Sequence, residues 1–430
     1  MSIPAPLRLP PYARLNSATT LVNGSDGDEL SEGDISMEEI LKSPPFSPRS
    51  AGEYFAVLCV LALVLLFRLN PTSTFSHASS SAAASSRPLV LPYTLVGPRH
   101  FSPPAPACSA EDFLHAVKHA RLREDGKSRA INLAPVTDVT VQPLEFSFDF
   151  AEDSQCAPPH AYSQEEACDL LASFGGVYML GDSYTRHILT ALYIILRDRL
   201  DGATVDYLTT TDCRGDHMFA EGKTCRIRVP EDTGLLPPGV PDICGGRVQI
   251  RYVHRWADAG GVATDTVDYA MWRGRLPAEM QSRSPVFLES HGIHYNYNVP
   301  PLLTGWAAHL KNYISGNTFP RPLNIFAGPH QAPANQELGY IPTQGPVPIR
   351  NFAEQVDLWM RKAWSGTAAS EGAGRYMDFV SATDGAASFD GCHLALQANL
   401  EKTHLLLNYL DILHREIVAA GGLVEVAPSA

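Results

Sequence analysis

The stretch VYMLGDSYTRHILTALYIIL, from Val177 to Leu196, places a small hydroxyl between two apolar runs. Its first four residues are typical of a buried strand, and residues 184–199 have helical spacing. Ser183 therefore falls where a predicted strand turns into a predicted helix. The helix N-terminus adds backbone N–H groups and a positive dipole end, which together stabilise an oxyanion. The position suits a nucleophile, although a simple helix cap uses the same residue type.

A serine nucleophile needs a base, and the base needs an orienting carboxylate. The downstream stretch FDGCHLALQANL holds Asp390 and His393 just before a predicted terminal helix. In a tight loop this spacing lets the carboxylate hold the imidazole Nδ1–H while Nε2 faces the serine. The alternative is that Asp390 caps the last helix and His393 packs on it. The two signals together favour Ser183, His393 and Asp390 as catalytic residues.

The chain around these motifs alternates predicted strands with predicted helices. The strands are expected at 177–182, 247–256, 285–290, 323–328 and 375–380, and the helices at 109–122, 163–174, 184–199, 350–364 and 392–418. This alternation predicts an α/β fold, a three-layer α/β/α sandwich around a mostly parallel sheet. In such sheets ligands bind at the carboxyl ends of the strands.

The N-terminal part differs in composition from the rest of the 430 residues. Residues 1–50 contain an acidic stretch without aromatics, Ser25–Glu39, and are expected to form a disordered tail. Residues 51–69 include the uncharged run YFAVLCVLALVLLF and approach the length of a membrane span, so we expect a single transmembrane signal anchor rather than a buried core helix. Residues 70–107, rich in Ser, Ala and Pro, are expected to be a stem, and 108–425 the globular domain. No basic patch with interleaved aromatics occurs, so nucleic acid is not an expected partner.

The cysteines indicate which side of the membrane the globular domain occupies. None of the eight precedes the anchor, Cys59 lies within it, and seven follow it. A cysteine-bearing domain fits an oxidising lumen, which predicts a type II protein of the Golgi or endoplasmic reticulum with residues 1–50 in the cytoplasm. The odd number predicts at least one free thiol or an intermolecular bond. We expect some of the seven to pair, and a disulfide at Cys392 is one possibility.

The motifs GDSYTRHI and DGCH before a terminal helix resemble those of the SGNH/GDSL hydrolase superfamily. More narrowly they resemble the PC-esterase branch, which includes trichome-birefringence-like polysaccharide O-acetyltransferases and the catalytic domains of sialate and capsule O-acetyltransferases. The resemblance extends from about Cys168 to Leu413, over half the chain. It implies an SGNH-like sandwich with Ser183 as nucleophile, His393 as base and Asp390 as its partner.

The resemblance also directs attention to donors for the oxyanion and to substrate contacts. Superfamily members supply a glycine and an asparagine after the second and third core strands. The corresponding candidates here are Gly245 or Gly246, Gly292, His294, and Asn296 or Asn298. Asp182 and Arg186 flank the serine; Arg186 is equally suited to a substrate contact and to a structural salt bridge. His187 is expected to pack. His330 follows a predicted strand, so a position facing the site is one alternative, but a loop histidine without a role is favoured.

Three functions are consistent with these features. The first is a membrane-anchored lumenal O-acyltransferase that forms an acyl-enzyme on Ser183 and passes an acetyl group to a hydroxyl of a glycan or polysaccharide. The second is an esterase with water as acceptor, and the third a non-catalytic glycan-binding or scaffold protein. One span cannot import acetyl groups, so the first function implies a separate supplier of the acyl donor, possibly derived from acetyl-CoA. No Cys-x-x-Cys, His-Glu-x-x-His or nucleotide-binding glycine motif occurs, so no metal or other cofactor is expected.

Overall fold

The computed structural model describes residues 94–96, 108–123, 146–204, 218–219, 225, 228–255, 262–315, 320–365, 374–388, 390–419 and 423–425. The expected acidic tail, the expected anchor and nearly all of the expected stem lie outside these described residues. Within the described ranges, no helix combines the length and the apolar character that crossing a membrane requires.

A five-stranded parallel sheet forms the centre of the fold, in the order β5-β4-β6-β7-β8. Its strands are β4 (Val177–Gly181), β5 (Ile250–His254), β6 (Val286–Ser290), β7 (Leu323–Ala327) and β8 (Arg375–Met377). Each falls within a strand expected from the sequence. Counted along the chain the order is 2-1-3-4-5, so the strand order reverses between β4 and β6. Doubly wound sheets of this order bind ligands at that switch point, outside the carboxyl ends of the strands.

Helices and short strand pairs surround the sheet. The α-helices are α2 (Ala110–Lys118), α4 (Gln164–Ala172), α5 (Ser183–Arg197), α6 (Val262–Arg275), α7 (Ala278–Gln281), α8 (Val299–Ser315), α9 (Ile341–Gln344), α10 (Pro346–Ser365) and α12 (Leu396–Ala419). The 3₁₀ turns are η4 (Thr233–Leu235), η5 (Ile243–Gly246), η7 (Ile293–Tyr295) and η8 (Ser381–Thr383). β1 (Thr94–Val96) pairs with β9 (Leu423–Glu425), and β2 (Arg121–Leu122) with β3 (Phe148–Asp149). Helices α6, α7, α8 and α9 lie outside the helices expected from the sequence.

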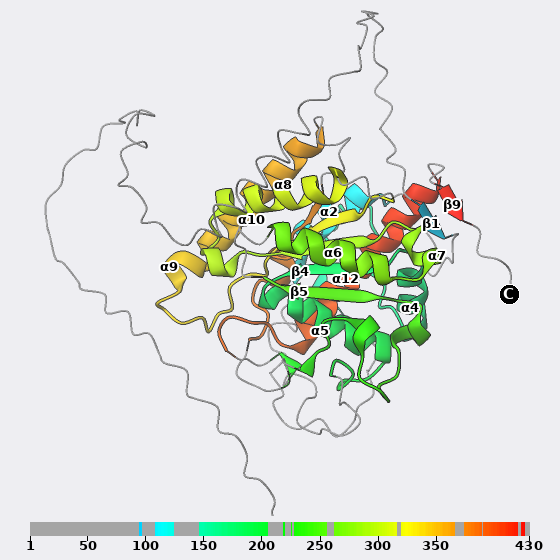
Figure 1. The fold of residues 1–430 in the computed structure, drawn as a ribbon. Helices are drawn as coiled ribbons and strands as arrows, with labels where there is room; N and C mark the ends of the chain where they lie inside the picture. The colour runs from blue at the N-terminus through cyan, green and yellow to red at the C-terminus, as the bar shows by residue number, and fades with distance from the viewer. Residues whose placement is uncertain are drawn as a thin grey trace, which may run out of the picture. The chain divides into compact units, whose positions relative to one another are not determined.

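Both faces of the sheet are covered by helices. Along β4, Val177 and Met179 pack into a core shared with α2, α4, α5 and α12. The alternate residues Tyr178 and Leu180 pack into a second core shared with α6, α8 and α10. In Figure 1, α8 and α10 lie together, well apart from α4 and α5. Strands buried on two faces have continuous apolar sequences, which is why they could be recognised as short apolar runs.

Disulfide bonds connect segments around α2 and α4. Disulfides join Cys108 to Cys156 and Cys168 to Cys244, and Cys225 is bonded to a cysteine outside the described residues. The expected pairing of several cysteines is thus confirmed. Cys392 is a free thiol, so the disulfide considered there is wrong; it packs at the edge of the second core instead.

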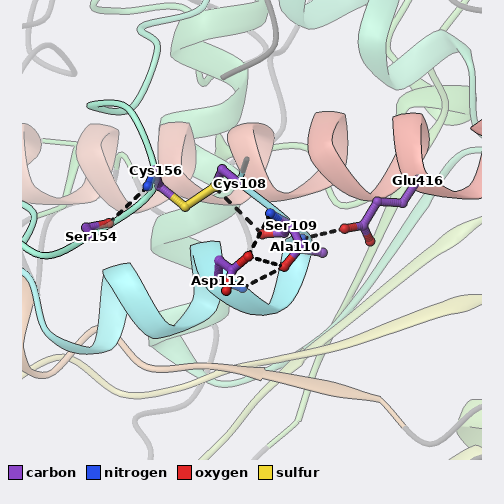
Figure 2. The surroundings of a disulfide bond; sticks show 7 residues. All are labelled: Cys108, Ser109, Ala110, Asp112, Ser154, Cys156 and Glu416. Atoms are coloured by element: carbon purple, nitrogen blue, oxygen red, sulfur yellow. Dashed lines mark hydrogen bonds between the residues drawn. A yellow bond between two sulfur atoms is a disulfide. The ribbon is translucent and has the colours of Figure 1, made fainter. Parts of the chain in front are cut away.

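Figure 2 shows the first disulfide beside the first turn of α2. Ser109 and Asp112 form a capping box at this helix N-terminus. The N–H of Ala110 donates to Glu416 Oε1 of α12 over 2.8 Å. The disulfide therefore lies where α2 is anchored to the long C-terminal helix.

Candidate active site

Ser183 is the first residue of α5, immediately beyond the carboxyl end of β4. The preceding Asp182 is the N-cap, and its carboxylate accepts from the N–H of Tyr184 over 2.9 Å. Gly181 is required by close packing, because a Cβ there would lie 2.1 Å from both the Ser290 carbonyl oxygen and Thr185 Oγ1. The sequence Gly-Asp-Ser thus makes a tight turn that presents the serine hydroxyl at the switch point of the sheet.

The hydroxyl of Ser183 meets an imidazole from the other end of the domain. His393 Nε2 lies 2.8 Å from Ser183 Oγ, and His393 Nδ1 lies 2.8 Å from Asp390 Oδ2. A carboxylate can only accept, so Nδ1–H donates to Asp390, and in the neutral imidazole Nε2 is left to accept the proton of the serine. Asp390 Oδ1 also accepts the backbone N–H groups of Cys392 and His393, over 2.9 and 2.7 Å. The loop before α12 therefore fixes both the carboxylate and the imidazole.

Asp390 and His393 stabilise each other's charged forms. Burial lowers the pKa of His393, but hydrogen bonds with the side chains of Asp390 and Cys392 outweigh it and raise the pKa to about 10. Burial raises the pKa of Asp390, but the hydrogen bonds from His393 more than compensate and leave it lowered. The imidazolium–carboxylate pair is therefore strongly favoured, and the neutral imidazole is a strong base.

Two further histidines lie behind the loop that carries Asp390 and His393. His330, expected to lack a role, is buried, and its Nε2–H donates to the Cys392 carbonyl oxygen over 2.8 Å. It thereby supports the loop that carries Asp390 and His393. His187 packs as expected, with its ring 4.7 Å from that of His393. Burial lowers the pKa of both His187 and His330 well below the usual value, which keeps them neutral.

A lysine of α12, which was not expected from the sequence, is buried close to Tyr184, the residue after Ser183. Lys402 is 2% exposed, and its Nζ donates to Asn399 Oδ1 over 3.3 Å. The amine lies 6.0 Å from the ring centre of Tyr184 and 5.7 Å from that of Phe379. Burial lowers its pKa to about 7, opposed by the carboxylate of Asp182. The one available signal was the apolar character of the surrounding helix, since lysine itself is typical of a surface.

The other expected site residues divide into two groups. Arg186 and His294 line the same cavity as Ser183 and His393. Gly292 lies two residues beyond Ser290, which is the partner of Gly181 in the sheet register. A Cβ on Gly292 would lie 2.8 Å from the ring of Tyr297. Among the described residues, neither Gly292 N–H nor Ser183 N–H has a hydrogen-bond partner.

Gly246 and Asn296 do not join this site. Gly246, like Gly245, precedes the amino end of β5, whereas Ser183 follows the carboxyl end of the parallel β4, so the two lie at opposite edges of the sheet. The side chain of Asn296 is turned to the protein surface, where its Oδ1 accepts from Gln344 Nε2 over 3.0 Å. Asn298 is also exposed. The expectation for Gly246 failed because spacing along the chain does not say which edge of a sheet a loop reaches. Asn296 follows β6 and so lies at the same edge as Ser183, but its side chain is exposed.

The triad opens into a cavity of about 700 Å³. Beyond the residues already named, its walls include Glu231, Tyr252, His254, Ile293, Glu337 and Tyr340. Tyr252 and His254 come from β5, with the Tyr252 hydroxyl 2.7 Å from His254 Nδ1. The lining is mixed, with carboxylates, imidazoles and amides around a few apolar surfaces. Across the described part of the chain, no three His, Cys, Asp or Glu side chains are grouped so as to hold a metal ion.

The fold and this site define an α/β protein with a parallel sheet and a Ser-His-Asp arrangement at its switch point. Comparisons with protein-family models, with curated proteins and with solved structures gave no match.

Proposed function

We propose that this protein is a serine-dependent O-acyltransferase that carries an acetyl group on Ser183 and transfers it to a hydroxyl of a glycan. The proposal includes membership of the PC-esterase branch of the SGNH/GDSL superfamily, because the motifs around Ser183 and His393 resemble the motifs of that branch. The observation that carries it is the unbroken hydrogen-bond chain from Ser183 Oγ through His393 to Asp390.

In the proposed reaction His393 Nε2 takes the proton of Ser183 as Oγ attacks the acyl carbon of the donor. The oxyanion that forms accepts from the N–H groups of Ser183 and Gly292. The leaving group departs with the proton from His393, and an acyl-serine ester remains. An acceptor hydroxyl then gives its proton to His393, attacks the ester, and releases Ser183 as the free alcohol.

The cavity favours a small acyl group and a polar acceptor. Its lining includes Glu231, Glu337 and Arg186, which are poor neighbours for a long apolar chain. The same polar cavity admits water, which supports hydrolysis by an esterase as the second candidate function. The two reactions share every step up to the acyl-enzyme.

The proposed location is the lumen of the Golgi or endoplasmic reticulum, behind a single anchor at residues 51–69. The disulfides Cys108–Cys156 and Cys168–Cys244 support an oxidising compartment. A lumenal transferase of this kind depends on a separate supplier of the acyl donor.

Exposure of the full-length chain, in detergent micelles, to an activated acetyl ester tests the proposal. We expect mass spectrometry to find the acetyl adduct on Ser183, and none on a Ser183→Ala chain. With oligosaccharides present, acetylated sugar supports the transferase, whereas free acetate alone supports the esterase. If no adduct forms on Ser183, both are wrong and a non-catalytic glycan-binding role takes their place.

A further inference from the structure

A short segment beside the catalytic cavity exposes several apolar side chains. Leu338 is 83% exposed, Tyr340 53%, Ile341 40% and Val347 68%. They lie just before α9, in α9 and at the start of α10. Tyr340 lines the same cavity as Ser183. An exposed aromatic side chain in the wall of a cavity that also holds a reactive serine is a candidate for contact with a ligand.

Hydrogen bonds fix this segment on both sides of the site. Asn335 Nδ2 donates to the Ser388 carbonyl oxygen over 3.1 Å, two residues before Asp390. At the other end Gln344 Nε2 donates to the Ile293 carbonyl oxygen over 3.2 Å, in the turn that follows β6. The backbone that carries Tyr340 is thus held between the loop of Asp390 and the turn after β6. A tyrosine side chain has only two rotatable bonds to order when a ligand packs on it.

Polar side chains share the cavity with Tyr340. Gln336, Glu337, Gln344 and His294 line the same cavity as Tyr340. A flat apolar ring bordered by carboxylate and amide groups matches a pyranose, which has apolar C–H faces and a polar rim of hydroxyls. An acyl chain would instead require continuous apolar walls.

We infer that Tyr340 is the platform on which a sugar ring of the acyl acceptor stacks, with the neighbouring amides and Glu337 binding its hydroxyls. This inference rests on the proposed function and assigns the acceptor subsite. A hydroxyl of the stacked sugar forms the new C–O bond to the acyl carbon as the bond from that carbon to Ser183 Oγ breaks. The hydroxyl proton passes to His393 Nε2 and then to Ser183 Oγ.

The first test measures how the acyl-enzyme divides between sugar and water. The full-length chain in detergent micelles receives 4-nitrophenyl acetate and neutral hexasaccharides of β-1,4-linked xylose, mannose or glucose. Tyr340→Ala should lower the ratio of acetylated sugar to free acetate about tenfold, since it removes the apolar surface under the sugar. Tyr340→Phe keeps the ring and should retain the wild-type ratio within about twofold. The matched control is Leu358→Ala, on an exposed apolar side chain of α10 outside the cavity, and should change nothing.

The second test measures binding without catalysis. Calorimetric titration of the hexasaccharides into a Ser183→Ala chain should detect binding that is lost in Ser183→Ala/Tyr340→Ala. If sugar is acetylated and Tyr340→Ala changes neither the ratio nor the binding, the subsite is wrong while the proposed function stands. If Ser183 never acquires an acetyl group but sugar binding depends on Tyr340, the proposed function is wrong and the subsite stands.

Two results would overturn the inference outright. One is that no hexasaccharide binds the Ser183→Ala chain. The other is that Tyr340→Ala impairs turnover of 4-nitrophenyl dodecanoate and leaves sugar binding intact, which would assign the ring to an acyl chain.

Discussion

Ser183, His393 and Asp390 form one hydrogen-bonded unit, so the loss of any member should disable the others. Ser183→Ala and His393→Ala are each expected to lower the rate of acyl transfer from an activated acetyl ester on the order of 10³-fold or more. The double variant should be hardly worse than either single one. Asp390→Asn should cost less, since it disturbs the orientation of the imidazole but leaves its basic nitrogen. Initial rates measure these losses, with circular dichroism as the control for folding.

The raised pKa of His393 makes the rate depend on pH. The neutral imidazole is the competent base, and with a pKa of about 10 it is the minor form at neutral pH. The kcat/KM for an activated acetyl ester should therefore rise from pH 7 towards pH 10. Asp390→Asn removes the main support of the imidazolium and should shift this rise to lower pH. A profile that is flat above pH 7 would contradict a raised pKa for His393.

The same group contributes to stability with a defined sign. The folded pKa of His393 lies above its unfolded value of 6.5. Its stabilising contribution is therefore fully present below about pH 6.5 and is lost as the pH rises through about 10.

Lys402 behaves in the opposite way, because burial lowers its pKa. Between about pH 7 and 10.5 the unfolded chain holds a proton that the folded chain lacks, so this group makes stability rise with pH across that interval. Lys402→Met keeps the length of the side chain and removes the buried charge. It is expected to raise the free energy of unfolding at pH 6 by about 1–4 kcal/mol, and by less at pH 10. Urea unfolding at the two pH values measures both; a destabilised variant at pH 6 would show that the ammonium is held by more than Asn399.

At the scale of elements, the disulfide Cys108–Cys156 fixes the start of α2 and closes a loop with a sequence separation of 48. Cys108→Ser/Cys156→Ser should lower the free energy of unfolding by about 2–4 kcal/mol, because the unfolded chain regains conformational freedom. Urea unfolding measures the change. Acyl-enzyme formation should persist under native conditions, since the disulfide lies outside the catalytic cavity. Loss of the Ser183 adduct in a folded variant would contradict this separation.

At the scale of the whole molecule, the proposed topology predicts which end is accessible. Protease added to sealed microsomes should remove a tag at the N-terminus and spare one at the C-terminus, because only residues 1–50 face the cytoplasm. Detergent should expose the C-terminal tag as a control. Protection of the N-terminal tag would refute the type II orientation.

Much of the fold could be predicted because its signals are local. The inner strands β4, β6 and β7 are buried along their whole length and have short apolar sequences, whereas β5, at the edge of the sheet, has the alternating sequence of a partly exposed strand. The candidate triad was also accessible: Ser183 follows a strand directly, and Asp390 and His393 lie within one tight turn. Their roles depend on neighbours a few residues away, which a sequence displays.

The contacts between distant segments were decided only by the tertiary structure. Sequence spacing does not tell which loops reach the carboxyl edge of the sheet, so Gly246 was misplaced. Nor does it tell which way a side chain in such a loop is turned, so Asn296 was misplaced and His330 was undervalued. A disulfide at Cys392 was considered because this residue lies between Asp390 and His393, but among the described residues its thiol is free. Lysine is typical of a protein surface, yet Lys402 is buried because α12 packs against α5. Burial and electrostatic environment are properties of packed elements, because they depend on which atoms exclude water from a group, and no local pattern of residues carries that information.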